Sequence, residues 1–146
     1  MKPLLIILTL LAVNFAQPAF AGEGDIKPSV LKSFQSTFTA AKAVEWTTTD
    51  NLIKARFELN GQVVSAYYNN SGSLLAVTRN ITTHQLPLSL QTSLKKEFNS
   101  FWVSDLFELN NDEGTTYYAT IETAETKVVL YSSNKSWSVY SKTKKD

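Results

Sequence analysis

Residues that could perform chemistry are few in this chain. It contains a single histidine, His84, and no cysteine. A general base must reach a substrate or nucleophile by hydrogen bonding and usually has an orienting partner. His84 instead lies in a polar linker, and the sequence has no Gly-x-Ser-x-Gly motif to supply a serine nucleophile. We therefore predict an exposed linker histidine and no catalytic residue.

Two pairs of carboxylates are the next candidates, as metal ligands. Asp112 and Glu113 lie in a turn-like cluster, and Glu122 and Glu125 flank a second expected turn. The first pair lacks the ligand spacing of a calcium loop, and zinc sites draw on His and Cys clusters that this sequence does not have. No glycine-rich phosphate loop is present. We predict solvated charges, no metal and no cofactor; an enzyme is the least favoured alternative, and His84 would be its only evident acid–base group.

The first 21 residues have the pattern of a secretory signal peptide. Lys2 precedes an apolar run over residues 4–15, and Ala19-Phe20-Ala21 is a small-x-small cleavage signal. The run is shorter than the roughly 20 apolar residues that span a bilayer. We predict cleavage after Ala21, no membrane span afterwards, and a location in the bacterial periplasm or outside the cell.

The charge balance excludes a typical nucleic-acid-binding protein. The chain has 14 Lys and Arg against 13 Asp and Glu, and loss of Lys2 with the leader leaves 13 of each sign. Nucleic-acid binders normally carry a clustered basic excess. The one basic cluster is Lys142, Lys144 and Lys145, which we interpret as a solvated, frayed tail.

Residues 22–146 form one expected domain with two copies of the same pattern. Repeat one covers about residues 28–80 and repeat two about residues 87–142. Each opens near a proline with apolar residues at helical spacing and continues with four strand-like runs. The matched positions, about 60 residues apart, are Val30, Phe34 and Phe38 with Leu90, Leu94 and Phe98, then more loosely Trp46 with Trp102 and Tyr68 with Tyr131.

This pattern predicts an α+β fold. Each half-sheet has one apolar face that needs cover, and each helix has one apolar face to offer. We expect tandem helix-plus-four-strand repeats that form one antiparallel sheet of about eight strands, with both helices on one face. The expected strands begin near Val44, Leu52, Gln62, Ser73, Phe101, Thr115, Lys127 and Ser136.

Asn60-Gly61 predicts the geometry of the first hairpin. The pair is the strongest short hairpin signal, because both central positions of a type I′ turn need positive φ. The resulting register places three pairs on the helix-covered face: Phe57 with Val64, Ala55 with Ala66, and Ile53 with Tyr68. The residues expected on the open face are Lys54, Arg56, Val63 and Tyr67 in repeat one and Tyr118, Val128, Leu130 and Tyr140 in repeat two. We assign Trp46, Trp102 and Trp137 to the core or to the helix–sheet seam.

These elements resemble the PepSY-like, or beta-lactamase-inhibitor-like, domains of exported bacterial proteins. The residues that carry the resemblance are Phe34, Phe38, Val44-Glu45-Trp46, Ala55-Arg56-Phe57, Ala66-Tyr67-Tyr68, Asn70-Ser71-Gly72, Ile81, Leu86-Pro87 and Phe98. The resemblance covers most of the chain after the leader and implies binding to another protein, sometimes a hydrolase, through the open sheet face. The acidic turn common in these domains is replaced here by Asn69-Asn70-Ser71-Gly72, and its glycine in the second copy by Lys135.

Two functions follow as hypotheses. The leading one is a non-enzymatic module that recognises a protein, through Lys54, Arg56, Tyr67, Tyr118 and Tyr140, and inhibits a hydrolase by occlusion. Tyrosine is also common in strands that bind nothing, so composition alone does not show that the open face is a binding surface. The alternative is a carrier of a small ligand, a peptide or a lipid, in the trough between the sheet and the helices.

The leader hypothesis makes a direct prediction about the exported chain. Cleavage after Ala21 leaves Gly22 as the first residue of a 125-residue protein. Intact-mass analysis of the protein secreted by a bacterial host should therefore give the mass of residues 22–146. A mass that includes residues 1–21 would contradict cleavage after Ala21.

Overall fold

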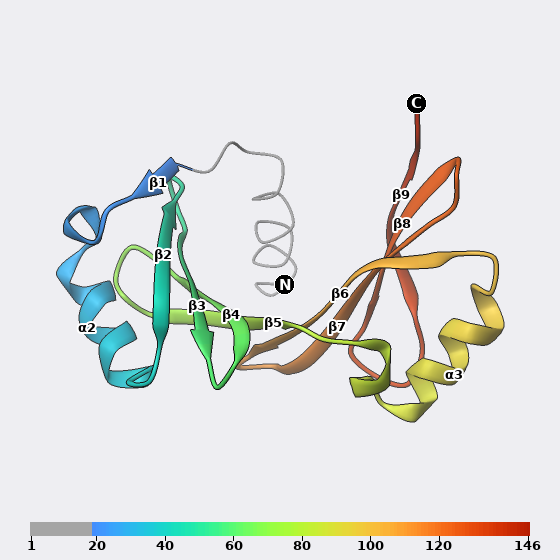
Figure 1. Ribbon diagram of the computed structural model, residues 1–146, viewed down its shortest axis with the longest axis horizontal. Helices are drawn as coiled ribbons and strands as arrows, with labels where there is room; N and C mark the ends of the chain where they lie inside the picture. The colour runs from blue at the N-terminus through green and yellow to red at the C-terminus, as the bar shows by residue number, and fades with distance from the viewer. Residues whose placement is uncertain (1–18) are drawn as a thin grey trace. The chain divides into compact units, whose positions relative to one another are not determined.

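The computed structural model describes residues 19–146 and contains two α-helices and nine strands (Figure 1). Residues 1–18, which hold most of the expected leader, lie outside this description. The helices are α2 (Pro28–Thr37) and α3 (Leu88–Glu97), and short 3₁₀ turns at Glu23–Asp25 and Thr83–Gln85 precede them. The strands are β1 (Ala19–Ala21), β2 (Lys42–Thr48), β3 (Ile53–Leu59), β4 (Gln62–Tyr68), β5 (Leu74–Asn80), β6 (Trp102–Asn111), β7 (Gly114–Glu122), β8 (Thr126–Ser132) and β9 (Ser138–Lys144).

The strands follow one another in the sheet in chain order, from β1 to β9. Strands β2 to β9 are the eight that the sequence predicts, and β1 adds a short ninth. The α+β class and the antiparallel sheet are thereby confirmed. The chain divides into two compact units, and the boundary falls inside β5, between Val77 and Thr78.

In the first repeat, α2 packs on the sheet through Phe34. Pro28 occupies the first turn of the helix, where its missing N–H is not needed. The Phe34 ring centroid lies 5.0 Å from that of Phe57, 5.1 Å from that of Trp46 and 5.5 Å from that of Phe38. Two of these contacts, to Phe57 and Trp46, are edge-to-face, a favourable arrangement for aromatic rings. The other buried members of this core are Ile26, Val30, Ile53, Ala55, Val64, Ala66 and Tyr68.

The first hairpin has the register that Asn60-Gly61 predicts. Asn60 has φ 52° and Gly61 has φ 77°, as a type I′ turn requires. In the ladder, Phe57 pairs with Val64, Ala55 with Ala66 and Ile53 with Tyr68, and all six side chains are buried. The prediction of this turn and of the covered face of the first repeat is confirmed.

The second repeat buries a comparable core under α3. Leu90 and Leu94 provide the buried face of the helix. The indole N–H of Trp137 donates a hydrogen bond to the carbonyl of Leu90 at 3.0 Å, which ties the loop before β9 to the helix. The other buried members of this core are Ile81, Leu86, Leu106, Ala119, Ile121, Val128 and Leu130.

The two repeats do not keep one offset over their whole length. The helices begin at Pro28 and Leu88, 60 residues apart. The hairpin pairs Phe57–Val64 and Ile121–Val128 are 64 apart, because β6 and β7 are longer than β2 and β3.

Two of the expected correspondences are wrong, the first within the 60-residue offset and the second because of the change to 64. Trp46 corresponds to Leu106, which is buried in the second core, and not to Trp102. Tyr68 pairs with Ile53 in the first hairpin, and the position equivalent to it is Ser132, which pairs with Tyr117; the expected match with Tyr131 is wrong.

The turn before β5 packs against the start of α2 through Gly72. This residue has φ 91°, and a Cβ added there would lie 2.9 Å from the backbone carbonyl oxygen of Ser29. No real Cβ tolerates that approach, so the turn or the helix would have to move.

We expect Gly72→Ala to lower the free energy of unfolding by about 2–4 kcal/mol, from backbone strain and the clash together. Gly61→Ala is the matched control: φ is also positive there, but nothing lies within 4 Å, and we expect a loss of about 1–2 kcal/mol. Urea unfolding followed by fluorescence measures both. Equal losses would show that the Gly72–Ser29 contact is unimportant.

Candidate binding surfaces

The helix-free side of the first repeat combines a buried tyrosine with two basic side chains. Lys54 and Tyr67 are direct partners across β3 and β4, and the Lys54 ammonium lies 5.7 Å from the Tyr67 ring centroid, within cation–π range. Burial lowers the pKa of Lys54 below its ordinary value, and the positive charge of Arg56 lowers it further. Tyr67 is only 7% exposed, so its ring forms the floor of this surface.

Arg56 and Val63 are the exposed members of the same surface. The Arg56 guanidinium lies 3.4 Å from a Glu45 carboxylate oxygen, and 52% of the Arg56 side chain is exposed. A solvent-exposed ion pair of this kind contributes little to stability. Val63 is 42% exposed although it is an aliphatic residue within a strand. We call Lys54, Arg56, Val63 and Tyr67 the first open face. All four lie on the side of the hairpin that the sequence predicts, but the expected exposure of Tyr67 is wrong, since it is buried.

The helix-free side of the second repeat carries an aromatic cluster. The Tyr118 ring stacks on Phe107 at 5.0 Å and on Tyr131 at 6.3 Å, and it meets Tyr140 edge-on at 6.2 Å. Tyr131 and Tyr140 also meet edge-on, at 6.2 Å. Because side chains alternate along a strand, Tyr118 and the core residue Ala119 lie on opposite sides of β7. We call these four rings the second open face.

The hydroxyl groups of this cluster are in an unfavourable environment. The side-chain oxygens of Tyr118 and Tyr140 are buried and find no hydrogen-bond partner among the described residues. Burial raises the pKa of Tyr118, and the neighbouring Tyr140 and Tyr131 raise it further. A buried donor without a partner costs about 1–3 kcal/mol, so these hydroxyls destabilise the cluster that their rings stabilise.

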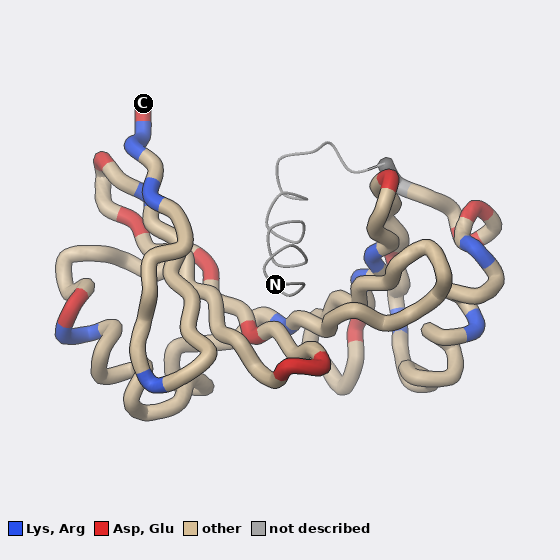
Figure 2. The backbone as a smooth tube through the Cα atoms, turned by 180° about the vertical axis from the view of Figure 1, so that it is seen from behind, with Lys and Arg blue, Asp and Glu red and all other residues tan. Residues whose placement is uncertain are grey.

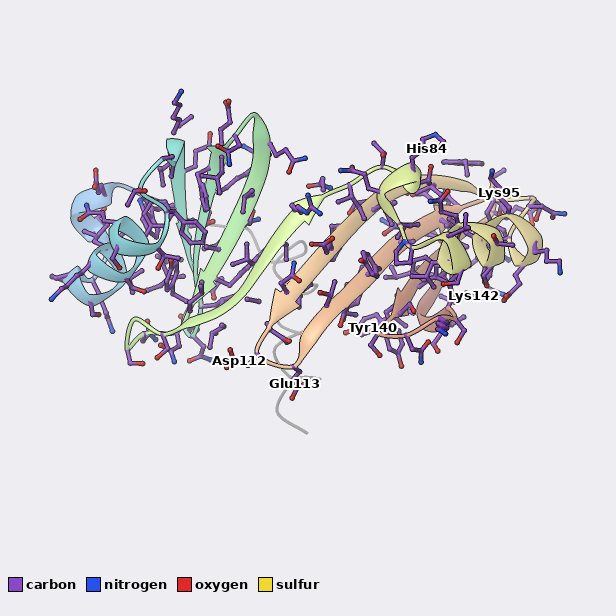
Figure 3. All side chains as sticks on the ribbon, turned by 90° about the horizontal axis from the view of Figure 1, so that it is seen from below. His84, Lys95, Asp112, Glu113, Tyr140 and Lys142 are labelled. Atoms are coloured by element: carbon purple, nitrogen blue, oxygen red, sulfur yellow. The ribbon has the colours of Figure 1, made fainter. Side chains whose placement is uncertain are left out.

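Three residues expected to be exposed in the second repeat are buried. Tyr118 is 1% exposed, because Phe107 and the other tyrosines cover it. Val128 and Leu130 lie in the core under α3, since Val128 pairs with Ile121 and Leu130 with Ala119 on the covered side. The exposure prediction for these residues is wrong, while Tyr140, itself a member of the second open face, is partly exposed (labelled in Figure 3).

Trp102 and the C-terminus also depart from expectation. Trp46 and Trp137 are buried as predicted, but Trp102 is 51% exposed at the start of β6. The Lys145 ammonium lies 4.9 Å from the Trp102 ring centroid, forms an ion pair with Glu122, and donates to the carbonyl of Thr123 at 2.9 Å. The expectation of a frayed tail is wrong here, because β9 runs to Lys144 and these contacts hold Lys145.

The candidate chemical groups remain separate from one another. Among residues 19–146 no three His, Cys, Asp or Glu side chains gather in a way that could hold a metal ion. The Asp112-Glu113 turn is an ordinary polar turn in which the Glu113 N–H donates to the Asn111 side chain at 3.0 Å. Glu122 accepts a hydrogen bond from Ser104 at 2.8 Å and pairs with Lys145.

A cleft opens in each repeat between the helix and the first long strand. The first, of about 380 Å³, is lined by Phe34, Val44 and Trp46 among others. The second, of about 300 Å³, has an apolar lining that includes Leu94 and Phe98, with His84 and Lys95 at its polar side (Figure 3). Small-ligand sites start at about this volume, so the clefts are at the lower limit for a carrier.

Charge distribution and helix length can be read directly from the described residues. Basic and acidic residues are interspersed along the backbone (Figure 2). In residues 19–146, neither helix has the length and apolar character that crossing a bilayer requires.

Comparison with known proteins identifies the fold. No protein-family model and no curated protein matches the chain. A BLIP-like protein from Bacteroides fragilis has a TM-score of 0.69 at 18% identity, covering 82% of this chain and 86% of that one. A protein described as periplasmic from Bacteroides eggerthii gives 0.73 at 14% identity over 82% and 88%, and a DUF2874 family protein from Bacteroides ovatus gives 0.73 at 13% over 82% and 87%. At these identities the likeness establishes a shared fold, and the PepSY-like part of the resemblance stays a prediction.

The aromatic cluster predicts opposite effects for two substitutions of Tyr118. Tyr118→Phe keeps the stacked ring and removes the unpartnered hydroxyl, so the free energy of unfolding should stay the same or rise by up to about 1 kcal/mol. Tyr118→Asp buries a charge and should lower it by 3 kcal/mol or more, a rough figure for an unpaired buried charge. Urea unfolding measures both, with Tyr131→Phe as the control that changes little. A loss above about 1 kcal/mol in Tyr118→Phe would show that the hydroxyl is hydrogen-bonded.

Proposed function

We propose that this chain is an exported, non-enzymatic binding module that recognises a protein partner through its open sheet face. The observation that carries the proposal is the first open face, where Arg56 and Val63 are exposed on the same side of the hairpin as the buried Tyr67. Arg and Tyr are enriched among the residues that dominate binding energy at protein interfaces. The scattered acid–base groups of the described chain favour binding over catalysis.

Both open faces contribute to this proposal, in different ways. In the first repeat, Lys54 and Arg56 offer positive charge and hydrogen-bond donors to an acidic or polar partner surface. In the second repeat, Tyr140 offers a partly exposed ring. The Tyr118 ring packs against Tyr140 but is itself buried and does not reach solvent. Of the five residues expected at the interface, Lys54, Arg56 and Tyr140 are the proposed contact residues. The buried Tyr67 and Tyr118 hold these neighbours in place.

The class of partner and the cellular location are inferred from the resemblance, from the expected leader and from structures that share the fold. The resemblance to beta-lactamase-inhibitor-like domains favours a hydrolase that is inhibited by occlusion, and a BLIP-like protein shares the fold. The expected leader over residues 1–21 and the neighbour described as periplasmic favour the bacterial envelope or the medium outside it.

A carrier of a small ligand is the second candidate. The observation that favours it is the cleft beside α3, where Leu94, Phe98 and Phe101 form an apolar lining and Lys95 could pair with an acidic head group. The volume of about 300 Å³ suits a small ligand and is too small for a long lipid tail.

The open-face proposal is tested by capture with matched variants. Immobilised residues 22–146 should retain a protein from native envelope extract, identified by mass spectrometry. The variant Arg56→Ala/Val63→Lys, which changes only exposed side chains, should bind that protein at least about tenfold more weakly. Leu88→Lys is the control, because Leu88 is 75% exposed on α3 and outside both open faces.

Two results would contradict the open-face proposal. Equal retention by the variant and the parent would place the contact elsewhere. Failure to retain any protein, together with a small molecule recovered by solvent extraction of the purified chain, would favour the carrier.

A further inference from the structure

The edge of β2 is covered by the last residues of the expected leader. Strand β1 lies antiparallel to β2, with Ala19 opposite Thr48, Phe20 opposite Thr47 and Ala21 opposite Trp46. Ala21 packs against the first core and lines the cleft beside Phe34 and Trp46. Cleavage after Ala21 would remove this strand and leave Gly22 as the chain start.

The second repeat contains the same arrangement, with a strand that is not removed. The N–H of Ile81, just after β5, donates to the carbonyl of Leu106 in β6 at 3.0 Å. Ala21 and Ile81 are 60 residues apart, as are Trp46 and Leu106 and the two helix starts. Ala21 therefore covers Trp46 in the first repeat as Ile81 covers Leu106 in the second.

Side chains strengthen this cover in the second repeat. The Arg79 guanidinium binds Glu108 through two hydrogen bonds, at 3.1 and 3.2 Å, and the Asn80 amide donates to Asp105 at 2.9 Å. In the second repeat the edge of β6 is thus paired, and side-chain hydrogen bonds hold the pairing segment in place.

The free edge in the chain that starts at Gly22 would be short and well defined. Towards its N-terminal end β2 is irregular, since Ala43 has φ 52° and the register with β3 shifts between Lys42 and Glu45. Such bulges prevent regular pairing along an edge. Residues 46–48 remain as the stretch that can accept a strand.

We propose that the edge of β2 in the mature chain is a strand-addition site for an extended segment of a partner protein. The segment runs antiparallel to β2, as β1 does, and places an aliphatic residue opposite Trp46. Alanine holds this place in the first repeat and isoleucine in the second, and the adjoining cleft of about 380 Å³ accepts the larger side chain. Main-chain hydrogen bonds supply affinity in this mode of recognition, and side-chain pockets supply specificity. The proposal depends on cleavage after Ala21 and is independent of the open faces.

A second copy of the chain is the competing occupant. Antiparallel pairing of two β2 edges over residues 46–48 would be centred on Thr47, and each copy would add only this three-residue stretch.

The test uses short peptides and the chain from Gly22 to Asp146. The probe is the blocked hexapeptide of residues 16–21 with the change Ala21→Ile, compared with the unchanged peptide and with Ala21→Asp and Ala21→Pro. The Ala21→Pro peptide stays apolar at this position. It lacks the backbone N–H that corresponds to the one Ile81 donates to the Leu106 carbonyl in the second repeat. Two-dimensional ¹H–¹⁵N NMR spectra would report the amides of residues 46–48, and titration would give each Kd.

The isoleucine peptide should bind about tenfold more tightly than the unchanged one, because it buries more apolar surface. The aspartate and proline peptides should bind at least about tenfold more weakly than the isoleucine peptide, since one loses the apolar contact and the other the main-chain bond. A longer chain that begins at Gln17 keeps β1 and should bind none of the peptides at this edge.

Several outcomes would overturn the proposal. Absence of shifts at residues 46–48, or equal binding of the isoleucine and proline peptides, would exclude strand addition. A dimer of the chain from Gly22, detected by sedimentation and joined through β2, would assign the edge to a second copy. Unfolding of that chain would show that β1 belongs to the functional fold.

Discussion

Both repeats depend on one constraint, the burial of a short helix against one side of a hairpin. In the first repeat this contact is centred on Phe34, whose ring meets Trp46 and Phe57 from two different strands. A ten-residue helix is barely stable in water by itself, so packing on the sheet supplies most of its stability. Once one side of the strands is covered, alternation along each strand determines which side chains remain for a partner. The proposed binding surfaces are therefore a by-product of core formation.

Local sequence signals predict the parts of this fold that local chemistry controls. Asn60-Gly61 determines the first hairpin and its faces, and helical spacing locates Phe34 and Leu94 on buried positions. The hairpin of β7 and β8 has no such turn, and β8 carries apolar residues on both of its sides. Alternation alone therefore could not tell whether Leu130 faces the helix or the open side of the sheet. Burial of Tyr118 comes from rings on other strands, which no local pattern reveals.

The fold itself constrains function weakly. Solved structures share it with this chain at 12–18% identity, a level at which the likeness shows the fold alone. A fold of this kind can support many activities, so an argument about function has to rest on particular side chains. Here the side chains on which the proposal rests are the exposed Arg56 and Val63 and the partly exposed Tyr140.

The boundary between the two compact units runs through the middle of a strand, and this has a consequence for dividing the chain. Leu74 and Val77 of β5 pack against the first core, while Ile81, just beyond the strand, is buried in the second. Because β5 runs from Leu74 to Asn80 across this boundary, a shortened chain that ends or begins there keeps only part of the strand.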